Sequence, residues 1–382
     1  MLIIEHTIIL VFSISILIIA KINSRSITSL FNVENKKINS SLSILIPARN
    51  EENNIGKCLK SLIEDPNPDF EFLVLDDNST DKTSQIVSKL SEIDPRIRLI
   101  KGKKLPNDWT GKNWACHQLS SQAQGKLILF IDADTWVSNQ TINKAATYME
   151  GTQCDLLTVI PKRNPNCLIE KIMFPFIDWV TTSFLPIKFA GSIKTPYISA
   201  TFGQFMMFQK EKYFEAGGHS SLKGNVLDDI ELGRSIKRKG LNWKLLDGKK
   251  SVETEMYQTN IEAIKGLSRS IFPTFEYRIS TFLAAAIILF LVSLGPYISI
   301  YLWLSGYYQN EIIAMISLST LFFILYSWII ICSYFNHNKI TTIIYPFIIS
   351  VIFIIAIHSF FSYIFGLSKW KDRSINKYKI KL

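Results

Sequence analysis

Two pairs of aspartates have side chains that could take part in chemistry. Asp132 and Asp134 directly follow the uncharged apolar run 127–131, and Asp228 and Asp229 precede a helix-like stretch. Carboxylate oxygens are the ligands that Mg²⁺ and Mn²⁺ prefer, and one or two of them can hold such a cation while it bridges diphosphate oxygens. The apolar run delivers Asp132 and Asp134 to one edge of a sheet, so the sequence predicts a metal–diphosphate site there.

Each pair also has a purely structural interpretation. An Asp-x-Asp sequence can form a solvated turn or cap a helix. Acids that begin a helix, as Asp228 and Asp229 do before ELGRSIKRKG, stabilise the helix dipole. The choice between the two interpretations depends on whether both pairs reach one site.

Three other side chains are candidates for contact with a substrate. Trp109 and Trp114 have faces on which an acceptor could stack, although aromatic residues at this spacing also occur in cores. For His219, in Gly217-Gly218-His219, a structural hydrogen bond is favoured over a catalytic role. The five histidines form no spaced set, so the sequence does not indicate a nucleophile with an attendant histidine.

Residues 40–279 have the pattern of a soluble α/β domain that would position these groups. Short β-branched runs alternate with stretches of helical periodicity, which predicts βαβ units and a Rossmann-like, mostly parallel sheet. The runs are 42–48, 71–78, 97–102, 126–134 and 154–161. Ligands bind at the carboxyl edge of such sheets, where helix N-termini favour phosphate.

Apolar segments flank this domain on both sides. Residues 7–20 are uncharged, and the runs 281–304, 312–335 and 340–367 are each long enough for a bilayer, which needs about 20 residues. The sequence therefore predicts an N-terminal membrane anchor at 1–21, C-terminal membrane helices at 280–367 and a basic tail at 368–382.

The net charge of +10 is concentrated beside these segments. Eight of the ten net charges lie in 21–39 and 368–382. Basic residues beside spans indicate cytoplasmic anchors, whereas nucleic-acid binding requires a basic face with interleaved aromatics, so no nucleic-acid partner is expected. Three C-terminal crossings would place the basic tail outside, so we expect 281–304, broken at Gly295-Pro296, to be re-entrant or interfacial. The prediction is a multi-pass cell-membrane protein with a cytoplasmic catalytic domain.

One apolar segment inside the soluble range is harder to assign. Residues 167–191 contain Phe, Trp and Pro and few charges. They are expected to form either an interfacial amphipathic segment or a buried helix of the soluble domain. A true crossing is excluded if Asp134 and Asp229 share one site.

Composition excludes several other classes of protein. The chain has 382 residues, 48% of them hydrophobic, and a mean hydropathy of +0.18, which is too apolar for disorder and too charged for a pure membrane protein. Its five cysteines lack a CxxC pair, so neither a disulfide framework nor a zinc site is predicted. A reducing compartment is expected.

Several motifs in a fixed order carry a resemblance to a known family. SILIPARNEENNIGKCLKSL, FLVLDDNSTDKT, GKLILFIDADT, EAGGHSS and LDDIELGRSIKRKG together resemble the family 2 glycosyltransferases, which have a GT-A nucleotide-diphospho-sugar transferase fold. The segment 105–125 is similar to a narrower branch, the membrane-bound glycosyltransferases of carotenoid and hopanoid biosynthesis. The C-terminal membrane segments followed by WKDR at 370–373 fit the same branch.

The resemblance implies a role for each matching position. Asp77 would bind the nucleotide base, Asp132 would lie near the ribose and the metal, and Asp134 would bind the Mg²⁺ or Mn²⁺ that holds the donor diphosphate. The catalytic base would come from Asp228-Asp229, with Asp229 preferred. Arg49 and Glu52 would line the nucleotide pocket. Lys112 would contact the donor diphosphate, and the alternative is that it is a surface lysine.

The sequence departs from the processive members of this family. It has no Gln-x-x-Arg-Trp motif. In cellulose and chitin synthases this motif helps to hold the growing polymer, so its absence predicts an enzyme that makes a single transfer. In its place 266–270 contains Arg269, which is expected either near the diphosphate or acceptor or at the membrane surface.

The resulting functional prediction is a metal-dependent, inverting, membrane-anchored glycosyltransferase. It would move one sugar from a nucleotide-sugar, UDP-linked, to a lipid-like acceptor such as a carotenoid, hopanoid or other lipid hydroxyl. A carboxylate acceptor is already ionised and needs no base, so the acid pair favours a hydroxyl. The alternatives are a polyprenyl- or dolichyl-phosphate glycosyltransferase and a non-catalytic membrane scaffold that retains a transferase domain.

Overall fold

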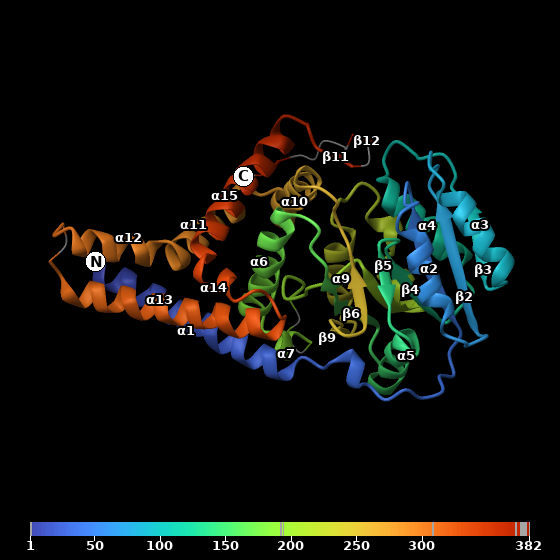
Figure 1. The fold of residues 1–382 in the computed structure, drawn as a ribbon, viewed down its shortest axis with the longest axis horizontal. Coiled ribbons are helices and arrows are strands. Elements are labelled where there is room, and N and C mark those ends of the chain that lie inside the picture. The colour runs from blue at the N-terminus through green and yellow to red at the C-terminus, as the bar shows by residue number, and fades with distance from the viewer. Residues whose placement is uncertain are drawn as a thin grey trace. The chain divides into compact units, whose positions relative to one another are not determined.

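The computed structural model describes residues 2–191, 193, 195–307, 309–370, 373–374 and 380–381. The chain forms two compact units, shown in Figure 1. The α/β unit comprises Ile27–Asn164 and Phe189–Met256, and the helical unit comprises Met1–Ser26, Pro165–Lys188 and Tyr257–Leu382. The range 40–279 that was predicted for the soluble domain thus includes segments of both units.

A seven-stranded sheet forms the centre of the α/β unit. β8 runs antiparallel to both of its neighbours, and the other described pairs are parallel, so the prediction of a mostly parallel sheet is confirmed. In sheet order the strands are β3 (Ile97–Lys101), β2 (Phe70–Asp76), β1 (Leu42–Ala48), β4 (Leu127–Ile131), β8 (Phe205–Gln209), β6 (Leu156–Ile160) and β9 (Trp243–Asp247).

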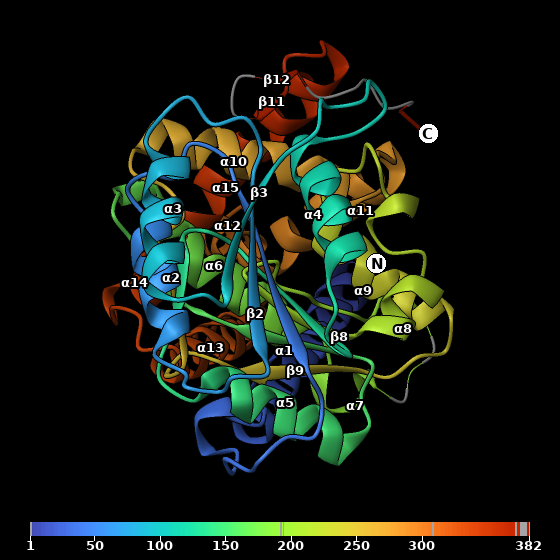
Figure 2. The same cartoon turned by 90° about the vertical axis from the view of Figure 1, so that its right-hand side faces the viewer.

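Helices cover both faces of this sheet, which is why β4 and β6 are buried along their whole length. Figure 2 shows α2 and α3 on one side of the strands and α4 on the other. α2 buries Ile55, Leu59 and Leu62, the stripe that its helical spacing predicts. The helices of the unit are α2 (Ile55–Ile63), α3 (Thr83–Ile93), α4 (Gly111–Gln122), α5 (Thr141–Thr152), α8 (Lys210–Glu215) and α9 (Asp228–Arg238), with 3₁₀ turns η1 (Leu30–Asn32) and η2 (His219–Ser221).

A second, three-stranded sheet lies beyond the end of β4. It consists of β5 (Thr135–Val137), β10 (Val252–Thr254) and β7 (Lys162–Arg163), in that order. Its central strand β10 runs antiparallel to β5, so the chain immediately after Asp134 is held by residues more than a hundred positions away. This small sheet fixes the backbone on which the Asp132–Asp134 loop stands.

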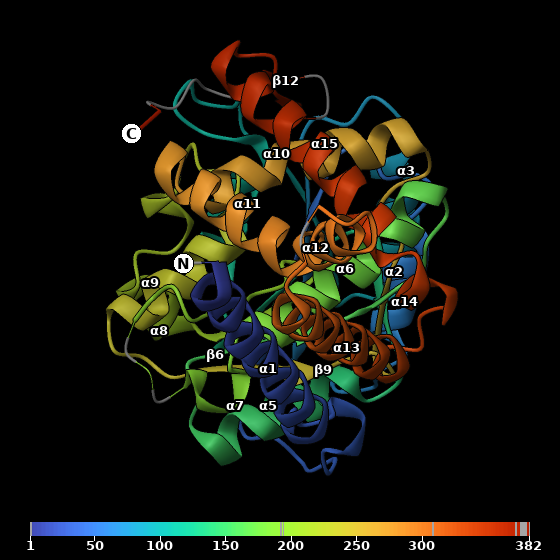
Figure 3. The ribbon, with the colours of Figure 1, turned by 90° about the vertical axis from the view of Figure 1, so that its left-hand side faces the viewer.

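The helical unit contains the apolar segments. α1 (Leu2–Ser26), α13 (Glu311–Tyr334) and α15 (Tyr345–Ile364) are long and apolar enough to cross a membrane. α11 (Ile279–Ser293) and α12 (Gly295–Leu304) form a pair bent by 45° that is either a broken span or a re-entrant loop. Figure 3 shows α1 alongside α13. The other elements are α6 (Leu168–Phe184), α7 (Ile187–Ala190, at the boundary of the two units), α10 (Asn260–Thr274), α14 (Ile340–Ile343), β11 (Lys369–Trp370) and β12 (Arg373–Ser374).

The break predicted at Gly295-Pro296 is present, because α12 begins there. The N-terminal helix α1 extends beyond the range 1–21 that was predicted for an anchor, since it continues to Ser26. Of the predicted basic tail, residues 371–372, 375–379 and 382 lie outside the described residues, and so does the centre of the WKDR motif.

Most of the ambiguous segment 167–191 forms α6, which is packed inside the helical unit, whereas the residues from Phe189 onward belong to the α/β unit. The indole of Trp179 is fully buried, donates a hydrogen bond to Ser327 Oγ (2.9 Å) and stacks on Trp328. Asp178 on the same helix pairs with His337 Nε2 at 2.8 Å. The neighbours of α6 are therefore the apolar helices and not the sheet of the α/β unit, and an interfacial position for this segment stays a prediction.

Candidate active site

Three adjacent parallel strands carry the predicted site residues to one edge of the sheet. β2, β1 and β4 are neighbours, and Ala48 of β1 is in register with Asp76 of β2. Arg49, Asp77 and Asp132 each follow the last residue of one of these strands. The carboxyl edge of the sheet is therefore where these three side chains gather, as the order of motifs predicted.

Arg49 and Asp77 connect the loops after β1 and β2. Arg49 Nη1 donates to the carbonyl oxygens of Asp77 (2.7 Å) and Asn78 (3.3 Å), and Asp77 N donates to Ala48 O at 2.8 Å. Asp77 is buried, with 3% of its surface exposed. Arg49 therefore fixes the loop in which Asp77 lies.

Glu52 joins the same two loops from the exposed side. Its Oε2 accepts from Lys82 N (3.1 Å), and its own backbone N–H donates to Asp81 Oδ2 (3.0 Å). The structure thus brings Arg49, Glu52 and Asp77 together, with Glu52 at the rim.

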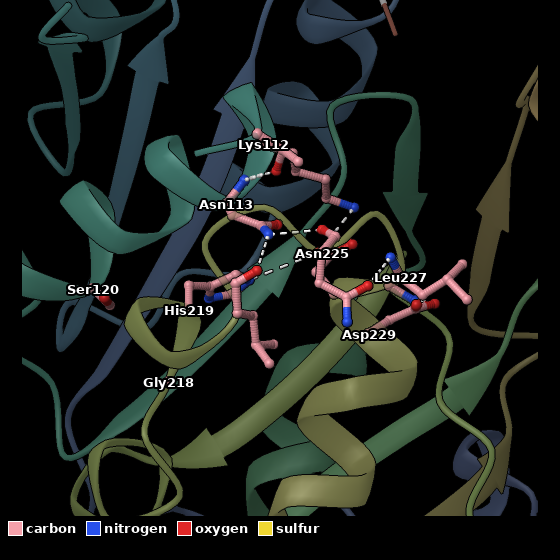
Figure 4. A network of polar contacts seen from close by, with 12 residues as sticks. Lys112, Asn113, Ser120, Gly218, His219, Asn225, Leu227 and Asp229 are labelled. Atoms are coloured by element: carbon pink, nitrogen blue, oxygen red, sulfur yellow. Dashed lines mark hydrogen bonds and ion pairs between the residues drawn. The ribbon is translucent and has the colours of Figure 1, made fainter. Parts of the chain in front are cut away.

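A lysine links the two aspartate pairs. Lys112 Nζ lies 2.8 Å from Asp132 Oδ1 and 3.7 Å from Asp228 Oδ2. Lys112 is on the first turn of α4, whose N-terminus is capped by Thr110 Oγ1, and Asp228 begins α9. Two segments almost a hundred residues apart therefore meet at one ammonium group, whose neighbourhood appears in Figure 4.

The charges and burial in this cluster shift the pKa values of its acids in different directions. Burial opposes the charge of Lys112, but Asp132 and Asp228 raise its pKa well above the ordinary value. Burial alone would raise the pKa of Asp228, yet Lys112 and His219 lower it far below the ordinary value, so Asp228 is ionised. Burial, and then the neighbouring charge of Asp228, raise the pKa of Asp229 to about 7. Burial also raises the pKa of Asp132, against the effect of Lys112.

Asp229 is held by two backbone N–H groups. Ile230 N donates to Oδ1 (2.8 Å) and Gly203 N donates to Oδ2 (3.2 Å). Gly203 precedes β8, and a Cβ there would lie 3.4 Å from Lys112 Nζ and 3.6 Å from Asp229 Oδ2. Gly203 was not among the predicted residues, and a glycine two positions before the apolar run FMMF is its only sequence signal.

Asn113 is a second residue that the sequence did not single out. Its buried Nδ2 lies within 3.2 Å of the carbonyl oxygens of Leu222, Lys223 and Asn225, and Asn225 Oδ1 accepts from Leu227 N (2.9 Å). Figure 4 shows this amide between α4 and the loop that leads to α9. Asn113 therefore sets the distance between Lys112 and the acids at the start of α9.

His219 is buried, with 2% exposed, and lies behind Asp228. Its Nδ1 is 2.7 Å from Tyr213 Oη, its backbone N–H donates to the same oxygen, and its Nε2 lies 3.7 Å from Asp228 Oδ2. Burial lowers the pKa of His219, although Asp228 opposes this, so the ring is neutral near pH 7. The structural hydrogen bond that the sequence favoured is present.

Trp109 and Trp114 form an aromatic cluster with His117. The ring centroids of the two tryptophans are 5.1 Å apart, and His117 lies 5.0 Å from Trp109. Trp109 is buried and Trp114 Nε1 donates a hydrogen bond to Lys103 O (3.2 Å), so this cluster stabilises the start of α4. An acceptor contact for either tryptophan stays a prediction.

Arg269 belongs to α10 of the helical unit. Its carbonyl oxygen accepts a hydrogen bond from Tyr363 Oη at 2.8 Å, which joins α10 to α15. The predicted approach of Arg269 to a diphosphate or acceptor stays a prediction.

The donor set after β4 fits a hard divalent cation. The backbone oxygen of Asp134 accepts from Thr254 Oγ1 and Glu255 N, each at 3.2 Å, which anchors the loop. Among the described residues no group of three or more His, Cys, Asp or Glu could hold a metal on its own. Asp132 and Asp134 would therefore supply two oxygen ligands and leave the others to phosphate and water, as Mg²⁺ and Mn²⁺ sites commonly do.

This sheet, with acids after β4 and at the start of α9, defines a GT-A fold. Residues 43–217 match the family described as Glycosyl transferase family 2, the family that the motifs resemble. A mannosyltransferase from Pyrobaculum calidifontis, solved with GDP-Man and Mn²⁺, has a similar fold, with a TM-score of 0.56 and 14% identity over 94% of this chain and 99% of that one.

Relatives with curated names belong to the carotenoid branch. A 4,4'-diaponeurosporenoate glycosyltransferase of Staphylococcus haemolyticus is 26% identical over 63% of this chain and 64% of its own length. The protein of that name from Staphylococcus aureus strain USA300 is 27% identical over 59% of this chain and 58% of its own length. The chain thus matches about three-fifths of the length of these relatives. The predicted resemblance to carotenoid glycosyltransferases is confirmed.

Proposed function

We propose that the protein is a membrane-anchored glycosyltransferase that transfers one sugar from a nucleoside-diphosphate sugar to a carotenoid-like lipid. The observation that carries the proposal is the contact of Lys112 with Asp132 after β4 and Asp228 at the start of α9. This contact supports a single site at the sheet edge for both aspartate pairs.

The acids have different roles in the proposed reaction. Asp229, with a pKa raised to about 7, accepts the proton of the acceptor hydroxyl as its oxygen attacks the anomeric carbon. The bond from that carbon to the donor diphosphate breaks, and the nucleoside diphosphate leaves with inversion. Asp228 stays ionised between Lys112 and His219 and keeps the first turn of α9 in place.

The leaving group is stabilised from the other side of the site. Lys112 interacts with the departing diphosphate, because its ammonium group is the cation at the cluster of acids. A Mg²⁺ or Mn²⁺ ion held by Asp132 and Asp134 supplies further positive charge to the phosphate oxygens when it is bound.

The nucleotide occupies the loops after β1 and β2. Asp77 accepts from the base, and Arg49 and Glu52 hold the shape of this pocket through their contacts with the 77–82 backbone. We expect UDP as the nucleotide, whereas the P. calidifontis mannosyltransferase was solved with GDP-Man. Both nucleotides therefore belong in the test.

The acceptor class has two candidates. The acid pair supports a lipid hydroxyl, since a hydroxyl needs a base. The name of the staphylococcal relatives, 4,4'-diaponeurosporenoate glycosyltransferase, denotes a carotenoid carboxylate and supports transfer to a carboxylate, with an ester as product. A carboxylate attacks without a base, so Asp229 would then position the acceptor.

The membrane helices support the location of this reaction. α1, α13 and α15 each have the length and composition of a span, which supports a multi-pass protein and a lipid-soluble acceptor. The basic residues of 21–39 support a cytoplasmic face for the transferase domain.

The experiment is a transfer assay with the full-length protein in lipid nanodiscs. Labelled UDP-glucose and GDP-mannose are each offered with a carotenoid alcohol, a carotenoid acid and a polyprenyl phosphate, and products are identified by mass spectrometry. We expect transfer from the UDP-sugar to a carotenoid. Labelling of polyprenyl phosphate alone would overturn the proposal, and no donor binding under any condition would point to a scaffold.

A further inference from the structure

An exposed aromatic ring lies on the α/β unit five residues after α1 ends. Phe31 has 49% of its surface exposed, whereas its neighbour Leu30 is fully buried in the core. The backbone around them is fixed, because Ser29 bridges to Asp247 and Asp247 N donates to Thr28 O (2.9 Å). The exposure of Phe31 is therefore built into the fold of this segment.

Two lysines from distant parts of the chain face this ring. Lys144 Nζ lies 5.1 Å from the centroid of Phe31 and donates to its carbonyl oxygen, and Lys250 Nζ lies 5.4 Å from the same centroid. Lys144 comes from α5 and Lys250 from the turn between β9 and β10. We call Phe31, Lys144 and Lys250 the Phe31 surface.

The two lysines of this surface differ from nearby lysines in whether a carboxylate pairs with them. Lys36 pairs with Glu34 at 3.0 Å and Lys249 pairs with Asp247 at 3.3 Å, so each of these is neutralised. Within the part of the chain that the structure describes, neither Lys144 nor Lys250 forms an ion pair with a carboxylate. Two like charges beside one apolar ring create a site where an anion would relieve their repulsion.

The segment that carries Phe31 is also held along α5. Asn143 Nδ2 donates to Lys36 O (2.6 Å), and Glu150 Oε1 accepts from the backbone N–H groups of Asn39 and Ser40. In Figure 1 this part of the chain runs beside α5. The Phe31 surface is therefore preorganised and needs no ordering when it binds a partner.

The covalent chain keeps this surface close to a bilayer. α1 has 25 residues, which corresponds to about 37 Å of helix and exceeds the roughly 30 Å of a hydrocarbon core. Its last residue, Ser26, would then lie among the headgroups, and the five residues to Phe31 span at most about 18 Å. An exposed ring flanked by ammonium groups at this depth fits the headgroup region, where apolar insertion and attraction to anionic lipid act together.

We infer that the Phe31 surface is a docking site for anionic phospholipid headgroups, with the ring inserted at the headgroup level and the two ammonium groups on lipid phosphates. This goes beyond the proposed transfer reaction and depends only on α1 spanning the bilayer. Its consequence is that the transferase domain is oriented on the leaflet by lipid contacts in addition to its covalent tether.

The test places a nitroxide label at the surface of the full-length protein. Cys58, Cys116, Cys154 and Cys332 are buried, so the exposed position Asn32→Cys combined with Cys167→Ser gives one accessible thiol beside Phe31 and keeps the ring. The protein is reconstituted in nanodiscs of phosphatidylcholine, with or without roughly 30% of the anionic lipid phosphatidylglycerol, which supplies the negative surface potential that attracts basic residues. The accessibility of the label to oxygen and to a water-soluble nickel chelate is then measured by EPR. We expect phosphatidylglycerol to raise the oxygen accessibility and lower the nickel accessibility, and high salt to reverse this.

Charge variants separate lipid docking from a structural effect. Lys144→Gln with Lys250→Gln should lower the ratio of docked to undocked protein about fivefold per lysine, while Lys144→Arg should preserve docking. Lys89→Gln with Lys101→Gln, at the β3 end of the sheet, removes the same charge elsewhere and should change nothing. Equal accessibility of the label in both lipids, or equal losses in the two Gln pairs, would overturn the inference.

Discussion

The ammonium group of Lys112 lies 2.8 Å from the Oδ1 atom of Asp132, and this contact closes the site across two elements. Asp132 follows β4, while Lys112 is on the first turn of α4, so the contact between them depends on the tertiary fold. Asp228, 3.7 Å away, shares the same cation. A single positive charge thus serves two acids, which leaves the cluster net negative and able to accept a divalent cation.

Lys112→Met tests whether this lysine binds the donor. Removal of the charge leaves Asp132 and Asp228 without their cation, so we expect the Kd of UDP to rise at least about tenfold in calorimetry. Lys57→Met is the control, because Lys57 is exposed and pairs with Glu255. An unchanged Kd with a lowered melting temperature would show that Lys112 has only a structural role.

Asp229→Asn tests the base and identifies the acceptor class. With a carotenoid alcohol, the loss of the proton acceptor should lower kcat by about 10²–10⁴-fold while donor binding persists. With a carotenoid acid the loss should be much smaller, because an ionised acceptor needs no base. Steady-state kinetics with both acceptors make the comparison, and an equal small effect on both would argue against Asp229 as the base.

The raised pKa of Asp229 predicts how stability depends on pH in the cation-free protein. Between the ordinary value of 3.8 and about 7 the folded state keeps a proton that the unfolded state has released. The free energy of unfolding should therefore fall as the pH rises through this window. Melting temperatures in EDTA from pH 5 to pH 8 should show the fall, and Asp229→Asn should reduce it. Transfer to a hydroxyl should change in the opposite direction, since only ionised Asp229 accepts a proton.

Sequence patterns predicted the sheet edge well because its signals are local. β1, β2 and β4 are apolar runs, and the polar residues that follow them must emerge at one edge once the strands are parallel. Asp132 was located by this rule, whereas Arg49 and Asp77 were singled out by the family resemblance. The acid pair Asp228-Asp229 needed the family resemblance, since the pattern alone equally describes a helix cap.

The residues that the sequence missed act through tertiary contacts. Asn113 looks like an ordinary polar residue of α4, and only the fold brings three carbonyl groups of the 222–225 loop to its amide. Gly203 is equally inconspicuous, because its importance comes from Lys112 and Asp229 on other elements. Burial of α6 against apolar helices likewise depends on partners more than a hundred residues away, such as Ser327.

Gly203→Ala tests how closely the site is packed. The added methyl group would lie in van der Waals contact with Lys112 Nζ (3.4 Å) and Asp229 Cβ (3.5 Å), so it would take up space between the two groups that are proposed to act on the substrates. We expect kcat to fall about tenfold or more while the melting temperature changes little, since misplacement on the ångström scale can cost about a hundredfold. Gly151→Ala is the matched control, because nothing lies within 4 Å of a Cβ at that position. Equal activity in both variants would contradict the proposed proximity of Gly203 to the reacting groups.

Asp134→Asn tests the cation site without requiring turnover. Asp132 and Asp134 supply too few ligands for a metal on their own, so the cation should bind strongly only together with a nucleoside diphosphate. In the wild type, UDP should therefore raise the melting temperature with Mn²⁺ or Mg²⁺ present, and only slightly in EDTA. Asp134→Asn should abolish this difference and leave the melting temperature of the nucleotide-free protein nearly unchanged. Asp69→Asn is the control, because Asp69 is exposed. Asp155→Asn is unsuitable, because Asp155 Oδ2 accepts a hydrogen bond from Asn242 N. If Asp134→Asn kept the full Mn²⁺ effect, the cation would not bind at the end of β4, and the proposed position of the donor diphosphate would be wrong as well.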